Sequence, residues 1–565
     1  MKSILKTVRR YLPPVALICA ALWLFWQIYP IIFATHDDMR NYTLVRRGLV
    51  FSDAVRSAKS GRISHLWNHH LLALPFRANK VWFYKLVQYA SLLFDVFAGW
   101  KLLKTHVDRK LADLAAVLFL SWACISAYHN LLISYAFCHQ IPIGFCFLSL
   151  YHFGNCLKSK SKKDAALSCV YLLLAVMIYE AFSALLLLFL LWSLCTPCGS
   201  GDKFFAWLKG SARRIFPQLL TVTAYCIVYF AWQHVYPPAY DGIAMNLHEP
   251  FMSMVSVKTY AFSFFPLWEL LRLAKEHPIT LTQFFGNLMH IAAWVSALLT
   301  AGTCYLLLPR IRMQAEKLRN LLLLSGLGIF LPCMLTAVSE KYMAWTRRGT
   351  DGYLPSFYSY FFVVVFLTGA AVLIYQSAPA GNRKKAARVI LTGCAFCICL
   401  SASAVTNMWK PAFAQLSLRY RNFDYVISQV LPDCNAGWQL CAPDNDGIHY
   451  ARNYTEDYLK IYNPEQIDFI HDPAELNAEK HTLCMRMPGN YAFAVTGETD
   501  SALHTGTLTF RTLVPEHFNI TLYDTNGNPL YYKDVCNGDQ LTLTDGAAFD
   551  LSKGVENTPV LCGVE

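Results

Sequence analysis

The chain has 565 residues, of which 55% are hydrophobic and only 15% are charged, against about 25% charged residues in an ordinary soluble domain. This composition excludes a typical soluble globular protein. The net charge of +12 is also uneven, because residues 407–565 hold ten Lys and Arg against 21 Asp and Glu, a net −11, which leaves +23 on residues 1–406. Nucleic acid explains this excess poorly, since most of it lies at the ends of apolar runs, where membrane topology accounts for it.

Apolar runs of spanning length recur throughout residues 1–406. A transmembrane helix needs about 20 mostly apolar residues, and suitable segments lie at 13–34, 81–102, 111–128, 133–153, 214–234, 286–308, 319–337, 357–376 and 386–406. The first is longer than a signal-peptide core and has no small-residue cleavage pattern, so we expect it to remain as the first helix. A further segment, 165–196, is too long for one span and contains Glu180 near its middle.

The basic clusters decide how 165–196 crosses the membrane. Cytoplasmic loops are enriched in Lys and Arg. If 165–196 is a hairpin of two short helices, the clusters at 2–10, 101–110, 158–163, 203–214, 310–319 and 383–388 all fall on one side. As a single helix it would put the later clusters on the other side. The sequence therefore predicts an all-α bundle of about eleven helices, with the N-terminus cytoplasmic, Glu180 at the outer tip of the hairpin, and residues 407–565 outside.

This topology leaves three long outer segments, 35–80, 235–285 and 338–356. Long ordered loops tend to be functional. The first carries a surplus of cations, and its apolar residues recur at helical spacing, which predicts one or two amphipathic helices at the membrane surface. The cations are Arg40, Arg46, Arg47, Arg56, Lys59, Arg62, Arg77 and Lys80.

The sharpest motif is His36-Asp37-Asp38, directly after the first helix. A carboxylate here could remove a proton from an acceptor hydroxyl, and the pair could hold a divalent cation through its oxygens. The alternative is a solvated helix end with ordinary interfacial charges. The motifs require no other cofactor.

Gly61-Arg62 follows 23 residues after Asp38, and His65 comes shortly afterwards. The planar guanidinium of Arg62 could pair with a phosphate, as could that of Arg40. His65 and His69 have helical i,i+4 spacing but no third ligand nearby in the sequence, so His65 is expected to contact substrate or solvent rather than a metal.

Further candidates lie in the other outer segments. Lys341, Arg347 and Arg348 stand among Tyr and Trp residues, a combination that suits a lipid phosphate and a sugar face, although an aromatic belt with snorkelling cations explains it equally well. In the second segment Tyr240 and Asp241 could face the same cavity, or simply form a turn. Glu180 is an ionisable residue within an apolar run and is therefore a functional candidate by default, unless it caps the hairpin.

The tail, 407–565, has the composition of a soluble domain. A helix is predicted through 412–430, followed by alternating strand-like stretches at 505–513, 518–523 and 540–544 that are separated by turn-forming pairs. We therefore expect an extracytoplasmic domain of α+β or β-rich type.

The arrangement of Asp37, Asp38, Arg40, Gly61 and Arg62 resembles the GT-C superfamily of membrane glycosyltransferases, and within it most the bacterial O-antigen glucosyltransferase type. The resemblance extends loosely over residues 1–406. It implies a location in the bacterial plasma membrane, a polyprenyl-phosphate-linked sugar donor, a cell-envelope glycan or lipid as acceptor, an acidic residue as general base, and inversion at the anomeric carbon.

Two other classes of function stay open. An envelope-polysaccharide polymerase or ligase would rely on Arg and His of the outer loops and would not need Asp37 and Asp38. A non-enzymatic lipid or solute transporter would be expected to have symmetry-related halves with broken helices and charges deep in the bundle, and no matching halves are evident in the sequence.

Overall fold

The computed structural model describes residues 2–32, 34–46, 48–78, 80–126, 129–196, 204–239, 242, 244–276, 280–349, 352–425, 437, 439–441, 468–470, 482–486, 493–500, 505–512, 518–523, 529–535, 539–544 and 561–564. It divides into two compact units. The first comprises Met1–Ile32 and Leu44–Pro411, and the second comprises Phe33–Thr43 and Ala412–Glu565.

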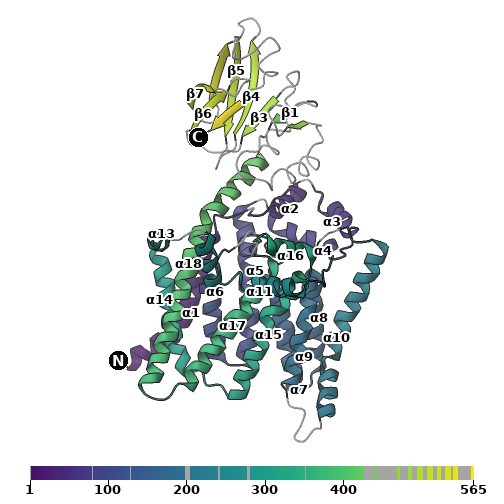
Figure 1. Ribbon diagram of the computed structural model, residues 1–565, viewed down its shortest axis with the longest axis vertical. Coiled ribbons are helices and arrows are strands. Elements are labelled where there is room, and N and C mark those ends of the chain that lie inside the picture. Colours follow the sequence, from purple (N-terminus) through teal and green to yellow (C-terminus); the bar gives the residue numbers. More distant parts are fainter. Residues whose placement is uncertain are drawn as a thin grey trace. The chain divides into compact units, whose positions relative to one another are not determined.

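The first unit is a bundle of helices that run side by side (Figure 1). Among the described residues, seven helices are long and apolar enough to cross a bilayer, which makes the chain a multi-pass membrane protein. They are α1 (Lys2–Ile28), α5 (Val81–His106), α10 (Phe204–Val235), α14 (Ile291–Leu307), α15 (Ala315–Ala337), α17 (Leu354–Ser377) and α18 (Asn382–Tyr425).

The remaining four predicted spans correspond to shorter helical segments. These are α6 (Arg109–Trp122), α7 (Pro142–Ser159), α8 (Lys162–Ile178), and the 3-10 helix η2 (Glu180–Leu185) continued by α9 (Leu186–Leu194). Each of the eleven predicted spans contains helical residues, but length and composition support membrane crossing for seven of the described helices.

The spans predicted at 111–128 and 133–153 are wrong in their bounds, because the described residues between α6 and α7, 123–126 and 129–141, form no helix. Most of this irregular segment is buried, and Tyr135 and Phe137 adopt positive φ values of 52° and 72°. Side chains replace the missing helical hydrogen bonds: Asn130 Nδ2 donates to Cys124 O (3.1 Å), and Gln140 Nε2 donates to Leu131 O (2.6 Å). Such irregular backbone is tolerated at membrane depth only where the protein itself satisfies it.

The segment 165–196 does fold back on itself. Helix α8 ends at Ile178 and η2 begins at Glu180. Both free ends of the hairpin contact the first half of α10, since Gln218 Nε2 donates to Ser168 Oγ and Ser211 Oγ donates to Ser193 O. The predicted hairpin, with Glu180 at its turn, is therefore confirmed.

Shorter helices occupy the long loops. The first loop contains α2 (His36–Arg46), α3 (Val50–Ala58), α4 (His65–Ala73) and η1 (Leu74–Phe76), so it is helical as predicted but holds more helices than the one or two expected. Others are α11 (Pro250–Phe262), α12 (Pro266–Glu276), α13 (Leu281–Gly286), η4 (Leu308–Arg310) and α16 (Glu340–Arg347). The buried side chains of His69 and Asp53 join α4 to α3, with His69 Nδ1 3.0 Å from Asp53 Oδ2.

In the second unit, strands follow the end of α18. One sheet has the order β2-β1-β3-β4-β5-β8 and the other the order β7-β6-β9. The predicted strands correspond to β5 (Thr505–Thr512), β6 (Phe518–Tyr523) and β8 (Gln540–Thr544). The others are β1 (Gln439–Cys441), β2 (Asp468–Ile470), β3 (Thr482–Arg486), β4 (Phe493–Asp500), β7 (Pro529–Val535) and β9 (Leu561–Val564).

Candidate functional site

The most concentrated group of predicted residues in the first unit surrounds the turn of the α8–η2 hairpin. Ser64 Oγ donates to Glu180 Oε1 at 2.7 Å, and Arg62 Nη2 lies 4.0 Å from Glu180 Oε2. The side chains of Arg62 and Glu180 are each 23% exposed. A cation and a carboxylate are therefore held together while both remain accessible to a ligand.

The conformation of Gly61 positions Arg62. Gly61 has a φ of +92°, and a Cβ at this position would lie 2.6 Å from Pro238 Cα. A glycine is needed here both for the left-handed backbone and for the close approach. The end of α10 holds the same turn, because Trp232 Nε1 donates to Ala58 O (2.8 Å) and Gln233 Nε2 donates to Gly61 O (3.3 Å).

Side chains of helix α4 cap the C-terminal end of α8. The last carbonyls of a helix have no partner within the helix, and two donors from α4 fill this role: Trp67 Nε1 donates to Met177 O and Asn68 Nδ2 donates to Ile178 O, both at 2.8 Å. This contact fixes α4, and with it Arg62 and Ser64, against the hairpin turn. We call Arg62, Ser64 and Glu180 the Arg62–Glu180 cluster.

A row of aromatic and histidine rings runs from this cluster to α16. Tyr179 lies beside Glu180, and its ring centroid is 5.9 Å from that of His139, which is 5.6 Å from that of Tyr135. Tyr135 and His129 are hydrogen-bonded at 2.9 Å, and His129 stacks on Trp345 with an interplanar angle of 9°. We call these five residues, Tyr179, His139, Tyr135, His129 and Trp345, the aromatic row.

Tyr179 was not predicted as a site residue, and neither were three further members of the row, His129, Tyr135 and His139. These three lie in the irregular segment 123–141, whose apolar composition had suggested helices. Two histidines and a tyrosine at 129–139, close to Asn130 and Gln140, are the signal that could have identified it. The strained φ of Tyr135 supports a functional role, because such conformations concentrate at functional sites.

The cations of α16 differ in their surroundings. Lys341 Nζ lies 5.8 Å from the centroid of the Trp345 ring, so the ammonium group is next to the last ring of the aromatic row. Arg347 donates to Glu249 Oε2, and Arg348 is exposed. The hydrogen bonds from Arg347 and Asn246 hold the pKa of the exposed Glu249 below its usual value. Lys341 is thus joined to the row, whereas Arg347 is already paired.

Asp37 and Asp38 belong to the second unit, in the first turn of α2. Acidic side chains are stabilised there by the helix dipole. Asp38 is 1% exposed, whereas Asp37 is partly exposed, and Asn41 Nδ2 donates to the main-chain oxygen of Asp37 at 2.7 Å. Arg40 is partly exposed on the same helix.

The other predicted site residues are placed as follows. The ring of His65 lies 5.1 Å from that of His69 on α4. Tyr240 and Asp241 lie outside the described residues. Within the described part of the chain, no group of three or more His, Cys, Asp and Glu is arranged to hold a metal ion. A divalent cation at Asp37 and Asp38 therefore stays a prediction.

Comparison with known proteins gives only distant similarities. No family model and no curated protein matches the sequence. Among solved structures, the chain is similar to ArnT from Cupriavidus metallidurans bound to undecaprenyl phosphate, with 10% identity, coverage of 84% of this chain and 93% of that chain, and a TM-score of 0.35.

Two archaeal structures give comparable values. AglB, an oligosaccharyltransferase from Archaeoglobus fulgidus in complex with an inhibitory peptide and a dolichol-phosphate, is 9% identical, with 83% and 65% of the two chains covered and a TM-score of 0.34. The Archaeoglobus fulgidus oligosaccharyltransferase in complex with Zn and sulfate is 11% identical, with 92% and 73% covered and a TM-score of 0.37. Similarity at this level is weak, so the chain's own residues must decide its function.

Proposed function

We propose that the protein is a membrane glycosyltransferase that moves a monosaccharide from a polyprenyl-phosphate donor to a cell-envelope glycan or lipid on the extracytoplasmic face. The observation that carries this proposal is the Arg62–Glu180 cluster with the aromatic row beside it. An accessible guanidinium suits a phosphate, ring faces suit a sugar, and the apolar bundle suits the lipid chain.

In the proposed reaction the acceptor hydroxyl attacks the anomeric carbon of the donor sugar. A carboxylate, for which the sequence motif offers Asp37 or Asp38, accepts the hydroxyl proton. A new bond forms between the acceptor oxygen and the anomeric carbon, and the bond between that carbon and the phosphate oxygen breaks. The lipid phosphate leaves with the bonding electron pair. Arg62 stabilises the negative charge that develops on the phosphate, with Lys341 as the second cation.

Asp37 is the better candidate for the base. A general base must come within hydrogen-bonding reach of its proton donor, and the Asp37 side chain is partly exposed whereas that of Asp38 is 1% exposed. In this assignment Asp38 is a positioning residue that stabilises the start of α2.

Single substitutions test the two aspartates separately. Asp37→Asn, Asp38→Asn and the control Glu340→Gln, which removes an exposed acid from the first turn of another short helix, are compared in membranes supplied with a polyprenyl-phosphate-linked radiolabelled sugar. We expect Asp37→Asn to abolish transfer and the control to retain it. Full activity of the Asp37→Asn, Asp38→Asn double variant would overturn the proposed role of α2.

A further inference from the structure

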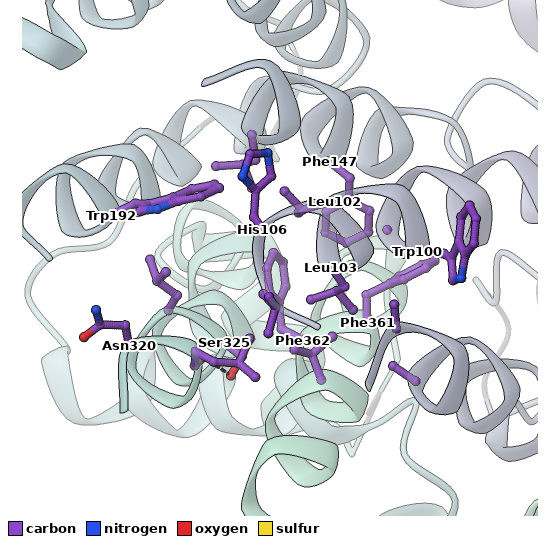
Figure 2. Close-up of a pocket in the computed structure, with 18 of the residues that line it drawn as sticks. Trp100, Leu102, Leu103, His106, Phe147, Trp192, Asn320, Ser325, Phe361 and Phe362 are labelled. Atoms are coloured by element: carbon purple, nitrogen blue, oxygen red, sulfur yellow. Dashed lines mark hydrogen bonds between the residues drawn. The ribbon is translucent and has the colours of Figure 1, made fainter. Parts of the chain in front are cut away.

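A second site lies in the other half of the first unit. A cavity of about 380 Å³ opens among α5, α6, α7, α9, α15 and α17 (Figure 2). On α5 its lining begins only at Val96 and continues to the helix end at His106. No residue of the Arg62–Glu180 cluster or the aromatic row lines it.

The inner part of this cavity is apolar. Figure 2 shows Leu103, Phe147, Phe361 and Phe362 around it, and Phe119 and Leu150 also contribute to the lining. Protein interiors rarely contain voids much larger than a water molecule, and lining atoms without partners lose their dispersion contacts. A space of this size, within the range of ligand pockets, is therefore expected to be occupied.

The surroundings indicate what kind of molecule fills it. The lining residues belong mainly to membrane-spanning helices, so lipid chains have access to the apolar part of the cavity. One apolar chain inserted between the helices would restore the missing contacts without breaking any helical hydrogen bond.

The rim of the cavity is polar. Lys317 and Asn320 line it, and the side-chain amide of Asn320 can donate to a head-group oxygen through Nδ2. Arg214 donates to the main-chain oxygen of Thr196, another lining residue, at 3.0 Å, and Lys158 donates to Thr105 O next to His106. Glu316 also lines the rim and balances Lys317, so the excess of cations comes from Lys158 and Arg214, which lie next to the lining without being part of it.

We propose that this cavity binds the apolar chain of an anionic lipid phosphate, whose head group lies at Lys317 and Asn320. The chain would occupy the space between Leu103, Phe119 and Phe361, and the phosphate would lie near the polar rim. This second lipid site is independent of the proposed glycosyl transfer. Its chemistry fits either a bulk anionic glycerophospholipid or a polyprenyl phosphate.

Photo-crosslinking of the full chain in phosphatidylcholine nanodiscs distinguishes these sources. Three probes with a diazirine on the chain are used in parallel: phosphatidylglycerol, a polyprenyl phosphate and phosphatidylcholine. Labelled peptides are identified by mass spectrometry. We expect at least one anionic probe to label lining peptides of α5, α6 or α17, and the probe that does so identifies the source. Absence of label from these peptides, or equal labelling by phosphatidylcholine, would overturn the proposal.

Two variants test the cavity and its rim, each with a control. Ala116→Phe fills the cavity and should lose the label, whereas Ala231→Phe, on the exposed face of α10, should keep it. Lys317→Gln leaves the interior unchanged and should weaken anionic labelling about fivefold, the effect of one cation near a lipid head group. The control Lys385→Gln replaces an exposed residue that does not line the cavity, and it should leave the anionic labelling unchanged. Equal losses in Lys317→Gln and Lys385→Gln would refute a specific head-group site.

Discussion

Arg62 offers the most direct test of the proposed site. Its Nη2 lies 4.0 Å from Glu180 Oε2, and both side chains are only 23% exposed. Measured partly exposed ion pairs contribute about 1 kcal/mol or less to stability, whereas a hydrogen bond to a charged ligand group contributes about 1.5–3 kcal/mol. Removal of Arg62 should therefore affect donor binding and catalysis more than folding.

We expect Arg62→Ala to lower kcat/KM for the lipid-phosphate donor about 10- to 150-fold, the rate equivalent of about 1.5–3 kcal/mol. Arg62→Lys should fall between this variant and the wild type, because it keeps the charge and loses the planar fork. The assay is sugar transfer in nanodiscs over a range of donor concentrations. The exposed Arg77, at the end of η1, provides the matched control, and Arg77→Ala should be unchanged.

A double-mutant cycle separates substrate binding from structural support. Glu180→Gln keeps an acceptor for Ser64 but removes the charge that competes for Arg62. If Arg62 binds the donor phosphate, the loss caused by Arg62→Ala should persist in the Glu180→Gln background. If that loss disappears in this background, Arg62 acts only by holding Glu180, and the proposed phosphate contact is refuted.

Three further outcomes follow from the geometry. Gly61→Ala should lower the free energy of unfolding by about 1–3 kcal/mol, because its Cβ would meet Pro238, whereas Gly48→Ala has open space and should cost less; equal losses of Tm would contradict this. Trp345→Ala should raise KM for the donor with little change in Tm, since its ring ends the aromatic row; an unchanged KM would remove it from the site. Because Glu249 has a lowered pKa in the folded protein, its contribution to stability is present above its unfolded pKa and is lost as pH falls through the folded value. The Tm difference between wild type and Glu249→Gln should therefore vanish in that acidic range, and a difference that persists below it would exclude the ion pair as its cause.

The parts of the fold that follow from length and hydropathy could be predicted. A helix that crosses a bilayer forms its backbone hydrogen bonds internally, so a run of about 20 apolar residues suffices to recognise it. The hairpin at Glu180 could also be predicted, because only an even number of crossings in 165–196 puts all the basic clusters on one side. In each case a single constraint acts on many residues at once: the width of the bilayer in the first, and the placement of all basic clusters on one side of the membrane in the second.

The irregular segment could not be predicted in the same way. Its apolar residues, such as Leu131 and Ile133, have the same hydropathy as residues of a helix. What replaces the helical hydrogen bonds is a set of individual contacts from Asn130 and Gln140, and such contacts leave no periodic pattern. The same holds for Gly61, whose requirement depends on Pro238, a residue far away in the sequence.

These unpredictable features also explain why the site lies where it does. A regular transmembrane helix uses every main-chain donor and acceptor internally and presents mainly side chains to its neighbours. The irregular segment separates α6 from α7 and brings His129 and His139 into one row between the hairpin turn and α16. A continuous helix would not allow this placement, because it rises about 15 Å over ten residues. The interruption requires side-chain hydrogen bonds from Asn130 and Gln140, so these two residues support the row although neither belongs to it. A polar residue buried beside irregular membrane-embedded backbone is therefore a better guide to a site of this kind than a charged residue in an exposed loop.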